Sequence, residues 1–449
     1  MKSHPLSRRS VLKGTAATAA LAGATSSSDL FGFAKAWAAS NPFKPEAGAS
    51  LSLTRWKRFV QSEDDDAFRA IVASFTKATG VNVKVVEEGL DDIQPKAAVA
   101  ANTGQGSDMF WGIYSFPHLF PKKSLDLTDA MDYLGKKYGG WTDAAVVYGR
   151  GSGNKWVCMP VGIVGNYINF RRSSIQKAGF KDVPEDMDGF LALLTALKKQ
   201  GTPGGFALGH ASGDGNAWTH WLLWAHGGKL VDENDKVAID SAETRAALEY
   251  CKKLYGAFAP GTISWNDAFN NKAFLSEQIH LTGNGISIYA AAQRNAAKGD
   301  ATAQKVADDM DHAYYPIGPV GKPTEFQAVF PVMGMSYTRY PNAVKAFLTY
   351  WMEADQYNAW IAESVGYITH TLKAYDDNKV WNEDPKRRVF RDAGTRTLPF
   401  GYPGTIGERA ASAMADFIVV DMFANHASGR VSADDAIKQA ARQAGRIYR

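Results

Sequence analysis

Residues 75–86 read Phe75-Thr76-Lys77-Ala78-Thr79-Gly80-Val81-Asn82-Val83-Lys84-Val85-Val86, and a helix gives way to a strand within them. Before Gly80, apolar side chains recur every three or four residues from Asp64 onward, which is the spacing of one face of an amphipathic helix. After Gly80, apolar and polar residues alternate as they do in a half-buried strand. The sequence therefore predicts a helix over residues 64–79 and a strand over residues 81–86.

The same rhythm continues on both sides of this stretch. Leu51-Ser52-Leu53-Thr54-Arg55-Trp56 alternates like a strand, residues 93–102 have a helical pattern, and Asp108-Met109-Phe110-Trp111 is a short apolar strand. Strands that alternate with helices form a parallel α/β sheet with right-handed crossovers. Ligands of such sheets bind beyond the carboxyl ends of the strands, which is where Trp56 and Trp111 are expected.

The length of 449 residues exceeds what one hydrophobic core supports and indicates at least two lobes. Hydrophobic residues are 45% and charged residues 21%, which is typical of an ordinary globular protein. The later chain is predicted to form two extended pieces around Gly162 and Gly165. Helical patterns then follow over residues 190–199, 217–226, 242–255, 342–353, 356–364, 410–423 and 432–446.

The N-terminal segment has the layout of a twin-arginine signal peptide. It reads Ser7-Arg8-Arg9-Ser10-Val11-Leu12-Lys13, followed by an apolar run rich in Ala and Gly that is too short to span a bilayer. Small residues offer cleavage sites at Ala34-Lys35-Ala36 and Ala36-Trp37-Ala38, and we expect a signal peptide over 1–38 with a mature start near Ala39. No cysteine lies near this segment to carry a lipid, so we expect a soluble periplasmic protein without a lipid anchor.

The net charge of +4 belongs to this segment. Five of the 50 basic side chains and one of the 46 acidic ones lie in residues 1–38, which leaves 45 of each in the remaining chain. A neutral mature protein lacks the basic surface that nucleic-acid binding needs, so we predict no nucleic-acid partner.

Cysteine and histidine give no sign of a metal site. Cys158 and Cys251 could pair in an oxidising compartment or remain buried thiols. The nine histidines are scattered, and His220 and His226 lie on one Trp-rich stretch without a third ligand nearby. We predict no metal and no cofactor.

Several motifs recur in the order of a known family. They are Phe75 to Val83, Gly106-Ser107-Asp108-Met109-Phe110-Trp111, Leu125-Asp126-Leu127-Thr128, Pro160-Val161-Gly162 through Asn169, Lys177-Ala178-Gly179-Phe180, Gly227-Gly228 and Pro316-Ile317-Gly318-Pro319-Val320-Gly321. In these motifs the chain resembles extracellular solute-binding protein family 1, the carbohydrate-type substrate-binding proteins of ABC importers. The family commonly has Phe-x-x-Gly-Lys-x-Ala-Met where this chain has residues 274–281, Phe-Leu-Ser-Glu-Gln-Ile-His-Leu. The resemblance therefore bears more on the fold than on the ligand.

The resemblance implies a periplasmic-binding-protein-like α/β fold, in which two α/β lobes are joined by a hinge with the ligand cleft between them. It implies an N-terminal lobe of residues 50–163 plus 326–375 and a C-terminal lobe of residues 164–325 plus 376–449, with crossovers near 161–166 and 330–336. The implied role is not enzymatic. The protein would capture a small carbohydrate or polyol by hinge closure and deliver it, as a monomer, to the permease subunits of an ABC importer.

Position singles out five candidate ligand contacts. Sugars present apolar C–H faces and hydroxyl groups, so their sites combine aromatic rings with amides and carboxylates. Trp56 and Trp111 end strands at the expected cleft edge and Tyr114 follows in the next loop, although each could instead pack in the core. The polar loop Ser212-Gly213-Asp214-Gly215-Asn216-Ala217-Trp218 can present Asn216 and Trp218 to a solute, or it is an ordinary helix start.

The resemblance adds six further candidates. Trp265 and Asn284 resemble positions that face the cleft from the second lobe, and Tyr402 resembles a late aromatic platform of carbohydrate binders. Asn166 lies in the first crossover. Gly334 and Met335 lie in the return crossover, where backbone groups are expected to approach the solute.

Two alternatives remain open. One is a secreted carbohydrate-active enzyme, although a glycosidase needs two carboxylates flanking one cleft, and the acidic run Glu63 to Asp66 is better explained as a helix start. The other keeps the fold and changes the solute to a polyamine, an anion or iron, since Tyr314-Tyr315 is similar to the paired tyrosines of ferric-binding relatives.

Overall fold

The computed structural model describes residues 36–151 and 153–449. The predicted twin-arginine motif and the apolar run after it lie outside the described residues. Of the predicted signal peptide, Ala36, Trp37 and Ala38 belong to the described part, where they are helical.

The first sheet has five strands in the order β2-β1-β3-β8-β4. They are β1 (Ser50–Trp56), β2 (Asn82–Glu88), β3 (Met109–Trp111), β4 (Met159–Val164) and β8 (Ala328–Gly334). β1 pairs in parallel with both β2 and β3, which confirms the parallel arrangement predicted for the first three strands. β8 runs antiparallel to β3 and to β4, because it enters the sheet from the opposite end after the chain has built the second lobe.

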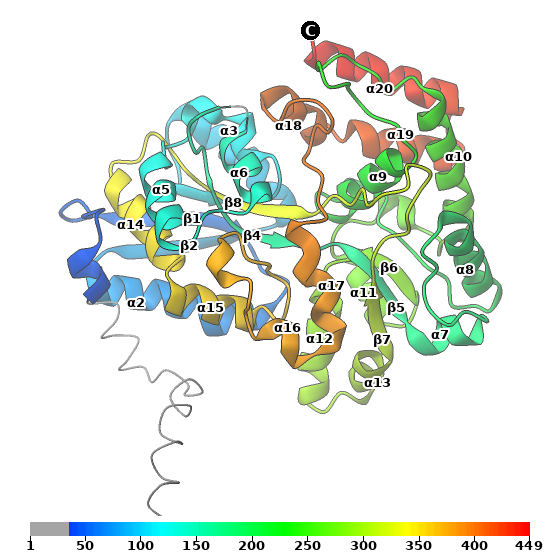
Figure 1. Cartoon of the computed structure of the whole chain (residues 1–449), viewed down its shortest axis with the longest axis horizontal. Helices are drawn as coiled ribbons and strands as arrows, with labels where there is room; N and C mark the ends of the chain where they lie inside the picture. The colour runs from blue at the N-terminus through cyan, green and yellow to red at the C-terminus, as the bar shows by residue number, and fades with distance from the viewer. Residues whose placement is uncertain (1–35, 152) are drawn as a thin grey trace, which may run out of the picture.

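Helices cover both faces of this sheet, with α2 and α3 on opposite sides as right-handed crossovers require (Figure 1). The helices of this half are η1 (Glu63–Phe68), α2 (Arg69–Thr79), α3 (Leu90–Thr103), α4 (Phe116–Leu119), η2 (Pro121–Lys123), α5 (Thr128–Lys137), α6 (Asp143–Arg150), α14 (Pro341–Trp351) and α15 (Ala354–Glu363). The helix predicted over 64–79 begins as a π-helical turn, η1, and ends at Gly80, whose φ of 78° favours glycine.

The second sheet is small and antiparallel, in the order β6-β5-β7. Its strands are β5 (Tyr167–Arg171), β6 (Leu281–Asn284) and β7 (Met310–Ala313). The helices around it are α7 (Arg172–Lys177), α8 (Met187–Lys199), α9 (Asp214–Ala225), α10 (Ala242–Ala257), η3 (Thr262–Ser264), α11 (Phe269–Leu275), α12 (Ser287–Ala297), α13 (Ala301–Asp309), α18 (Glu408–Ala415), α19 (Ile418–Ala427) and α20 (Ala433–Ile447). Every residue of α9 is buried, so this helix is the centre of the second half.

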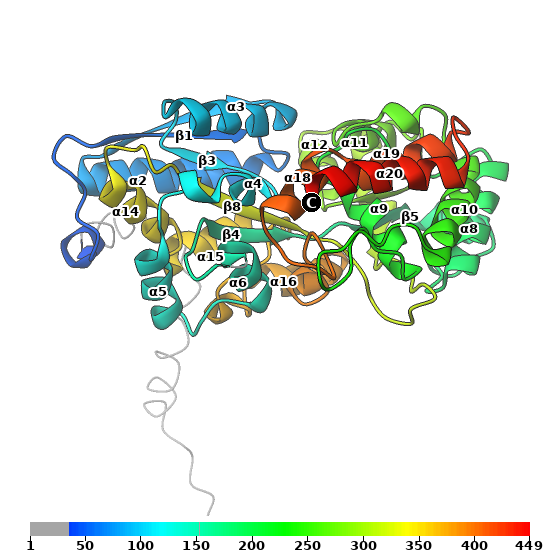
Figure 2. The same ribbon diagram turned by 90° about the horizontal axis from the view of Figure 1, so that it is seen from above.

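The two halves lie side by side in both views (Figures 1 and 2). Strand β4 belongs to the first sheet and β5 to the second, and only Gly165 and Asn166 separate them. The short elements η4 (Lys373–Tyr375), α16 (Val380–Glu383), η5 (Pro385–Arg387), α17 (Arg388–Arg391) and η6 (Asp392–Gly394) follow the bridge between Ile163 and Thr369 and lead back to the second half. Rigid sheets joined by short crossings are the arrangement in which two lobes can close by a hinge.

The C-terminal helices differ from the sequence expectation at one place. The helix predicted over 410–423 is broken into α18 and α19 at Phe417, whose φ of 53° ends the first helix. The last helix, α20 (Ala433–Ile447), agrees with the pattern predicted over 432–446, and Ser432 caps it, since Ser432 Oγ accepts a hydrogen bond from the Asp435 backbone N–H at 3.1 Å.

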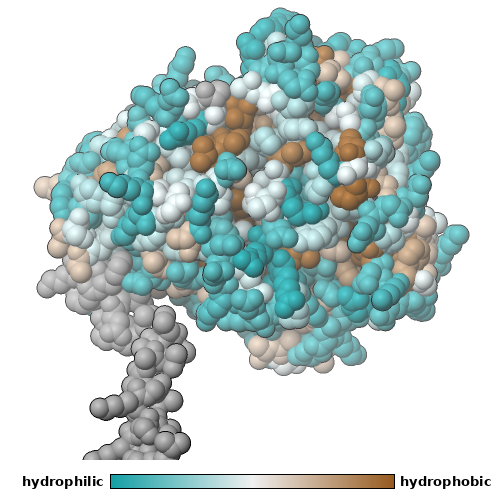
Figure 3. Space-filling model, viewed as in Figure 1, coloured by the Kyte–Doolittle hydropathy of each residue, from teal (hydrophilic) through white to brown (hydrophobic). Residues whose placement is uncertain are grey.

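Most large apolar side chains of the described residues are inside, and the exposed ones are Val99, Val147, Val237 and Phe269. On the face shown in Figure 3, hydrophobic residues form separate patches among hydrophilic ones. Within the described part of the chain, no helix combines the length and the apolar character needed to cross a membrane.

A buried carboxylate anchors the N-terminal segment to the first half. Glu353 accepts hydrogen bonds from Trp37 Nε1 at 3.2 Å and from the hydroxyls of Tyr133 and Tyr138, and it pairs with Lys137 Nζ at 2.6 Å. The Glu353 side chain is only 1% exposed. Trp37 is therefore part of the folded lobe.

Candidate functional site

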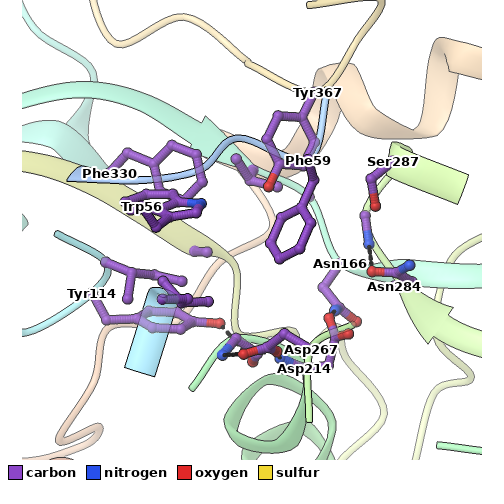
Figure 4. Close-up of a pocket in the computed structure, with 17 residues that line it drawn as sticks. Trp56, Phe59, Tyr114, Asn166, Asp214, Asp267, Asn284, Ser287, Phe330 and Tyr367 are labelled. Carbon is purple, nitrogen blue, oxygen red and sulfur yellow. Dashed lines mark hydrogen bonds between the residues drawn. The ribbon is translucent and has the colours of Figure 1, made fainter. Parts of the chain in front are cut away.

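A pocket lies between the two sheets (Figure 4). It opens at the carboxyl ends of β1 and β3 and at the beginning of β8, which lies beside them because β8 is antiparallel. Its lining comprises Trp56, Phe59, Leu90, Ile113, Tyr114, Val164, Gly165, Asn166, Gly213, Asp214, Asp267, Asn284, Gly285, Ser287, Ala328, Phe330 and Tyr367. This is the position at which α/β sheets bind ligands.

The wall formed by the first half is mainly aromatic. Trp56 ends β1, and its ring lies edge to face against Phe330 of β8, with 5.0 Å between ring centroids. Phe330 in turn contacts Tyr367 at 6.0 Å. Trp56 Nε1 is buried and has no hydrogen-bond partner among the described residues. The wall thus consists of packed aromatic rings, one of which has a buried N–H donor without a hydrogen-bond partner among the described residues.

A fully buried ion pair supports these rings from behind. The Arg58 guanidinium lies 4.4 Å from the Trp56 ring centroid and 4.7 Å from that of Phe330. Arg58 Nε donates to Glu63 Oε2 at 3.0 Å, and both side chains have no exposed surface. Arg58 does not line the pocket, so its charge stabilises the wall and is balanced within it.

Tyr114 joins the two walls. Its backbone φ of 52° lies in the left-handed region, which costs energy for a residue with a side chain and is held here by the bond from Tyr114 N to Val329 O at 2.8 Å. The Tyr114 ring stacks on Phe326 at 4.5 Å, and its hydroxyl donates to Gly213 O at 3.3 Å. The unusual backbone therefore aims this side chain at the second half.

The opposite wall is polar and its groups are oriented by one another. Tyr315 Oη donates to Asn166 Oδ1 at 2.6 Å, and Asn166 Nδ2 donates to Asp214 Oδ1 at 2.7 Å. Asn270 Nδ2 donates to the other oxygen, Asp214 Oδ2, at 2.7 Å. Burial and the neighbouring charge of Asp267 raise the pKa of Asp214 well above its usual range.

Asp267 belongs to the loop between η3 and α11, and in space it lies beside the start of α9. Its Oδ1 accepts from the backbone N–H of Asp214 at 2.7 Å, and both of its oxygens accept from the N–H of Gly213 at 3.1 Å. The start of a helix carries unpaired N–H groups and partial positive charge, which favour a carboxylate there. Burial nevertheless raises the pKa of Asp267 to about 6.

Two further polar groups reach the pocket from β6 and α12. Asn284 Nδ2 donates to Asn271 Oδ1, and Asn271 Nδ2 donates to Ser287 Oγ at 3.0 Å. Asn284 Oδ1 accepts from the Gly285 N–H at 2.8 Å. Preformed hydrogen bonds of this kind fix where a bound hydroxyl can donate and accept.

The pocket brings together four of the eleven predicted residues: Trp56, Tyr114, Asn166 and Asn284. Their contact with a solute stays a prediction. The other seven lie elsewhere.

The structure corrects the placement of three predicted tryptophans. Trp111 is fully buried among Phe68, Trp351 and Trp360, since the ring points from β3 into the helices behind the sheet. Trp218 packs on Phe206 and Phe258 in the core of the second half. Trp265 is half-buried over Gly205 and does not reach the pocket.

The remaining four predicted residues also lie outside the pocket lining. Asn216 points back along α9 and donates to Ser212 O at 3.2 Å. Gly334 and Met335 lie at the far end of β8, beside the beginning of β3, because the expected crossover at 330–336 is inside the first sheet. Tyr402 packs against Trp224 at 5.5 Å.

Sequence reasoning missed both acidic residues of the site and most of its rings. Asp214 belonged to the polar loop that was singled out, and its place at the start of a Trp-rich helix was the available signal. Asp267 had no such signal, because its role depends on the helix start 53 positions earlier in the chain. Phe59, Phe330, Tyr367 and Ser287 were also missed.

The two cysteines are buried and unpaired, and the hydroxyls of Tyr314 and Tyr315 have separate hydrogen-bond partners. Cys158 and Cys251 are both buried free thiols, and burial raises the pKa of each. Tyr314 donates to Asp392 whereas Tyr315 donates to Asn166, so the two hydroxyls do not converge. Within residues 36–151 and 153–449, no three His, Cys, Asp or Glu side chains gather in an arrangement suited to a metal ion.

A family model described as bacterial extracellular solute-binding protein matches residues 70–389. The chain belongs to this family. No curated protein matches its sequence.

Solved structures share the two-lobed fold over most of the chain. The GacH receptor of Streptomyces glaucescens, solved unliganded and with acarbose, is 19% identical with a TM-score of 0.73, over 90% of this chain and 99% of that one. Maltose-bound T. maritima MalE3 is 17% identical with a TM-score of 0.75, over 89% and 100%. An ABC transporter solute-binding protein from Agrobacterium radiobacter K84, in complex with ribitol, is 16% identical with a TM-score of 0.74, over 90% and 100%.

Proposed function

We propose that this protein captures a small sugar or polyol outside the cytoplasmic membrane and delivers it to the permease subunits of an ABC importer as a monomer. The observation that carries the proposal is the pocket between the sheets, in which aromatic rings face oriented amides and carboxylates. Apolar ring faces suit the C–H faces of a sugar, and the amides and carboxylates suit its hydroxyls. The structural relatives solved with acarbose, maltose and ribitol support the same substrate class.

The positions of the crossings support hinge closure between two lobes, with divisions at residues 163/164, 325/326 and 375/376. Asn166 lies in the first crossing, and its backbone N–H donates to the side chain of Gln327, in the second crossing, at 2.5 Å. A group that both contacts the pocket and joins the crossings would couple solute binding to closure.

The carboxylates of the pocket support binding rather than hydrolysis. Glycoside hydrolysis needs one carboxyl group on each side of the scissile bond. Asp214 and Asp267 instead share one wall, and protein donors occupy oxygens of both. The family and the similar structures are binding proteins as well.

A thermal-shift screen of sugars and polyols with the mature protein tests the proposal. A solute that binds only the folded protein stabilises it by about 2.7 kcal/mol at 100 times its Kd, so a bound sugar raises the melting temperature measurably. Phe59→Ala removes a half-buried ring from the pocket, and we expect it to weaken binding about tenfold. Phe269→Ala removes an exposed ring outside the pocket and is the matched control. A response confined to anions or metal ions would contradict the sugar assignment.

We further propose export by the twin-arginine route, with cleavage after Ala36. Sequence alone favoured a start near Ala39, but such a cut would remove Trp37, which is 4% exposed and packs edge to face on Tyr350 at 4.8 Å. Burial of a tryptophan contributes several kcal/mol that the mature protein would lose. The intact mass of protein recovered from the periplasm is expected to correspond to a chain that begins at Trp37. A mass for a chain beginning at Ala39 would refute this start.

A further inference from the structure

The pocket lining contains two acidic side chains and no basic one. Its seventeen lining residues include Asp214 and Asp267 but no Lys, Arg or His. Asp214 is 7% exposed and Asp267 is 9% exposed. Burying two adjacent carboxylates is costly unless each is compensated.

The start of α9 compensates one of these charges. Asp267 accepts from the N–H groups of Gly213 and Asp214, where the helix supplies about half a positive charge. This explains why Asp267 is a carboxylate. The start of α9 does not compensate the second acid, Asp214, in the same way.

Both oxygens of Asp214 accept hydrogen bonds from side-chain amides. Each oxygen faces an amide NH₂, that of Asn166 on one side and that of Asn270 on the other. Neither amide can turn its oxygen to Asp214 without losing other bonds. Asn166 Oδ1 accepts from Tyr315, and Asn270 Oδ1 accepts from the backbone N–H of Asn271 at 2.9 Å while Asn270 Nδ2 also donates to Gly283 O. Both oxygens of Asp214 therefore accept from fixed neutral donors that stabilise its charged form, whereas burial and the neighbouring Asp267 raise its pKa and oppose that charge.

The charged groups nearest the pocket do not balance this charge. Arg58 lies behind the aromatic wall and is paired with Glu63, while His210 stacks on Phe417 and pairs with Asp421 at 2.8 Å. Asp91, at the start of α3 on the other side of the pocket, adds a third negative charge that raises the pKa of Asp267. Among the described residues, no ion pair reaches Asp214 or Asp267. The tyrosines around them stay neutral, because burial raises the pKa of Tyr114, Tyr315 and Tyr367.

We propose that the solute carries a protonated amino group, so that it is an amino sugar or an amino polyol, and that this group binds at Asp214 and Asp267. This proposal rests on the proposed function and narrows its substrate class. An ammonium group donates three hydrogen bonds, and carboxylate oxygens that already accept one bond have a lone pair left for another. In Figure 4 the Tyr114 hydroxyl points toward the two carboxyl groups, and Trp56 lies across the pocket beside Phe330.

The test compares solutes that differ in one group. Isothermal titration at pH 7.5 uses glucose, glucosamine and N-acetylglucosamine as one set, and sorbitol and 1-amino-1-deoxysorbitol as the other, with mature protein freed of bound solute by refolding. We expect the amine of at least one set to bind about tenfold tighter than its neutral partner, and acetylation to remove this advantage.

A pair of variants and a pH series test whether Asp214 and Asp267 cause the preference for the amine. Asp214→Asn is expected to bring the amine-to-neutral affinity ratio close to one, whereas Asp377→Asn, which removes a fully exposed carboxylate, leaves the ratio as it was. The amine should also bind more weakly as the pH falls from 7.5 to 5. Asp267, whose pKa burial raises to about 6, becomes protonated in this range, and protons then compete with the ammonium group.

The outcomes separate this inference from the function on which it rests. Neutral sugars or polyols that bind as tightly as their amines would overturn the inference and leave the sugar-binding function intact. Tighter binding of putrescine, a diamine without hydroxyls, would uphold the cationic site and overturn the sugar assignment. Binding of no compound in either set, together with a response to anions, would overturn both.

Discussion

The Gly283→Ala protein is expected to have a free energy of unfolding about 3 kcal/mol lower than that of the native protein. It is also expected to bind its solute about 30-fold more weakly. Gly283 lies in β6, behind the polar wall of the pocket. A Cβ at this position would lie 2.2 Å from the Tyr315 hydroxyl and 2.8 Å from the Phe206 ring. Both side chains are buried, so neither can move aside without disturbing the core.

The loss of binding follows from the hydrogen bonds that Tyr315 makes. Its hydroxyl fixes the amide of Asn166, which in turn donates to Asp214. Displacing Tyr315 therefore disturbs the whole polar wall. Urea denaturation and solute titration measure the two effects.

Gly256→Ala is the matched control for this substitution. Gly256 lies on the exposed side of α10, and a Cβ there would have no heavy atom within 4 Å. Alanine favours helix more than glycine does, so this protein should be as stable as the native one or slightly more stable. If Gly283→Ala behaved like Gly256→Ala, the tight packing behind the pocket would have no energetic importance.

The Glu353→Gln protein is expected to lose about 3 kcal/mol of stability without a change in the pocket. Glu353 is an acceptor for Trp37 and Tyr133 on one oxygen and for Lys137 and Tyr138 on the other. A glutamine amide must place its NH₂ toward one of these two donor pairs. Donors then face a donor in a buried site, and the charge that holds Lys137 is lost.

Asp129→Asn provides the control for Glu353→Gln, because it also changes a carboxylate that pairs with a lysine. The Asp129 side chain is 55% exposed and lies 2.7 Å from Lys345 Nζ. Exposed ion pairs contribute less than about 1 kcal/mol, so this protein should unfold close to the native midpoint. Equal midpoints for the Glu353→Gln and native proteins would mean that the buried cluster does not stabilise the fold.

Much of the first sheet could be predicted from local pattern. The alternation in residues 51–56 and 81–86 and the stop at Gly80 are properties of short segments, and the structure forms β1, β2 and α2 there. The antiparallel strand β8 could not be assigned in the same way. Its pairing with β3 joins residues more than 200 positions apart, and its sequence is apolar along its whole length because both faces are buried.

The pocket was less predictable than the fold for a physical reason. Trp56 and Trp111 both end strands, yet Trp56 lines the pocket and Trp111 packs on Trp351 behind it. The register of strand pairing decides to which side of the sheet the last side chain of a strand points. The pattern of three residues in β3 does not fix that register. Asp267 shows the same limit, since a carboxylate on a loop becomes part of the site only when the start of α9 is placed beside it.

Asn166 is one of the two residues that cross from β4 in the first sheet to β5 in the second. This residue holds Asp214 through its side chain and Gln327 through its backbone, so turning the crossing strains the contacts that orient the acid. Separation of the lobes would therefore also disturb the polar wall of the pocket and weaken solute binding. For the proposed function, we expect the opening of the lobes at the importer to weaken solute binding in the same motion.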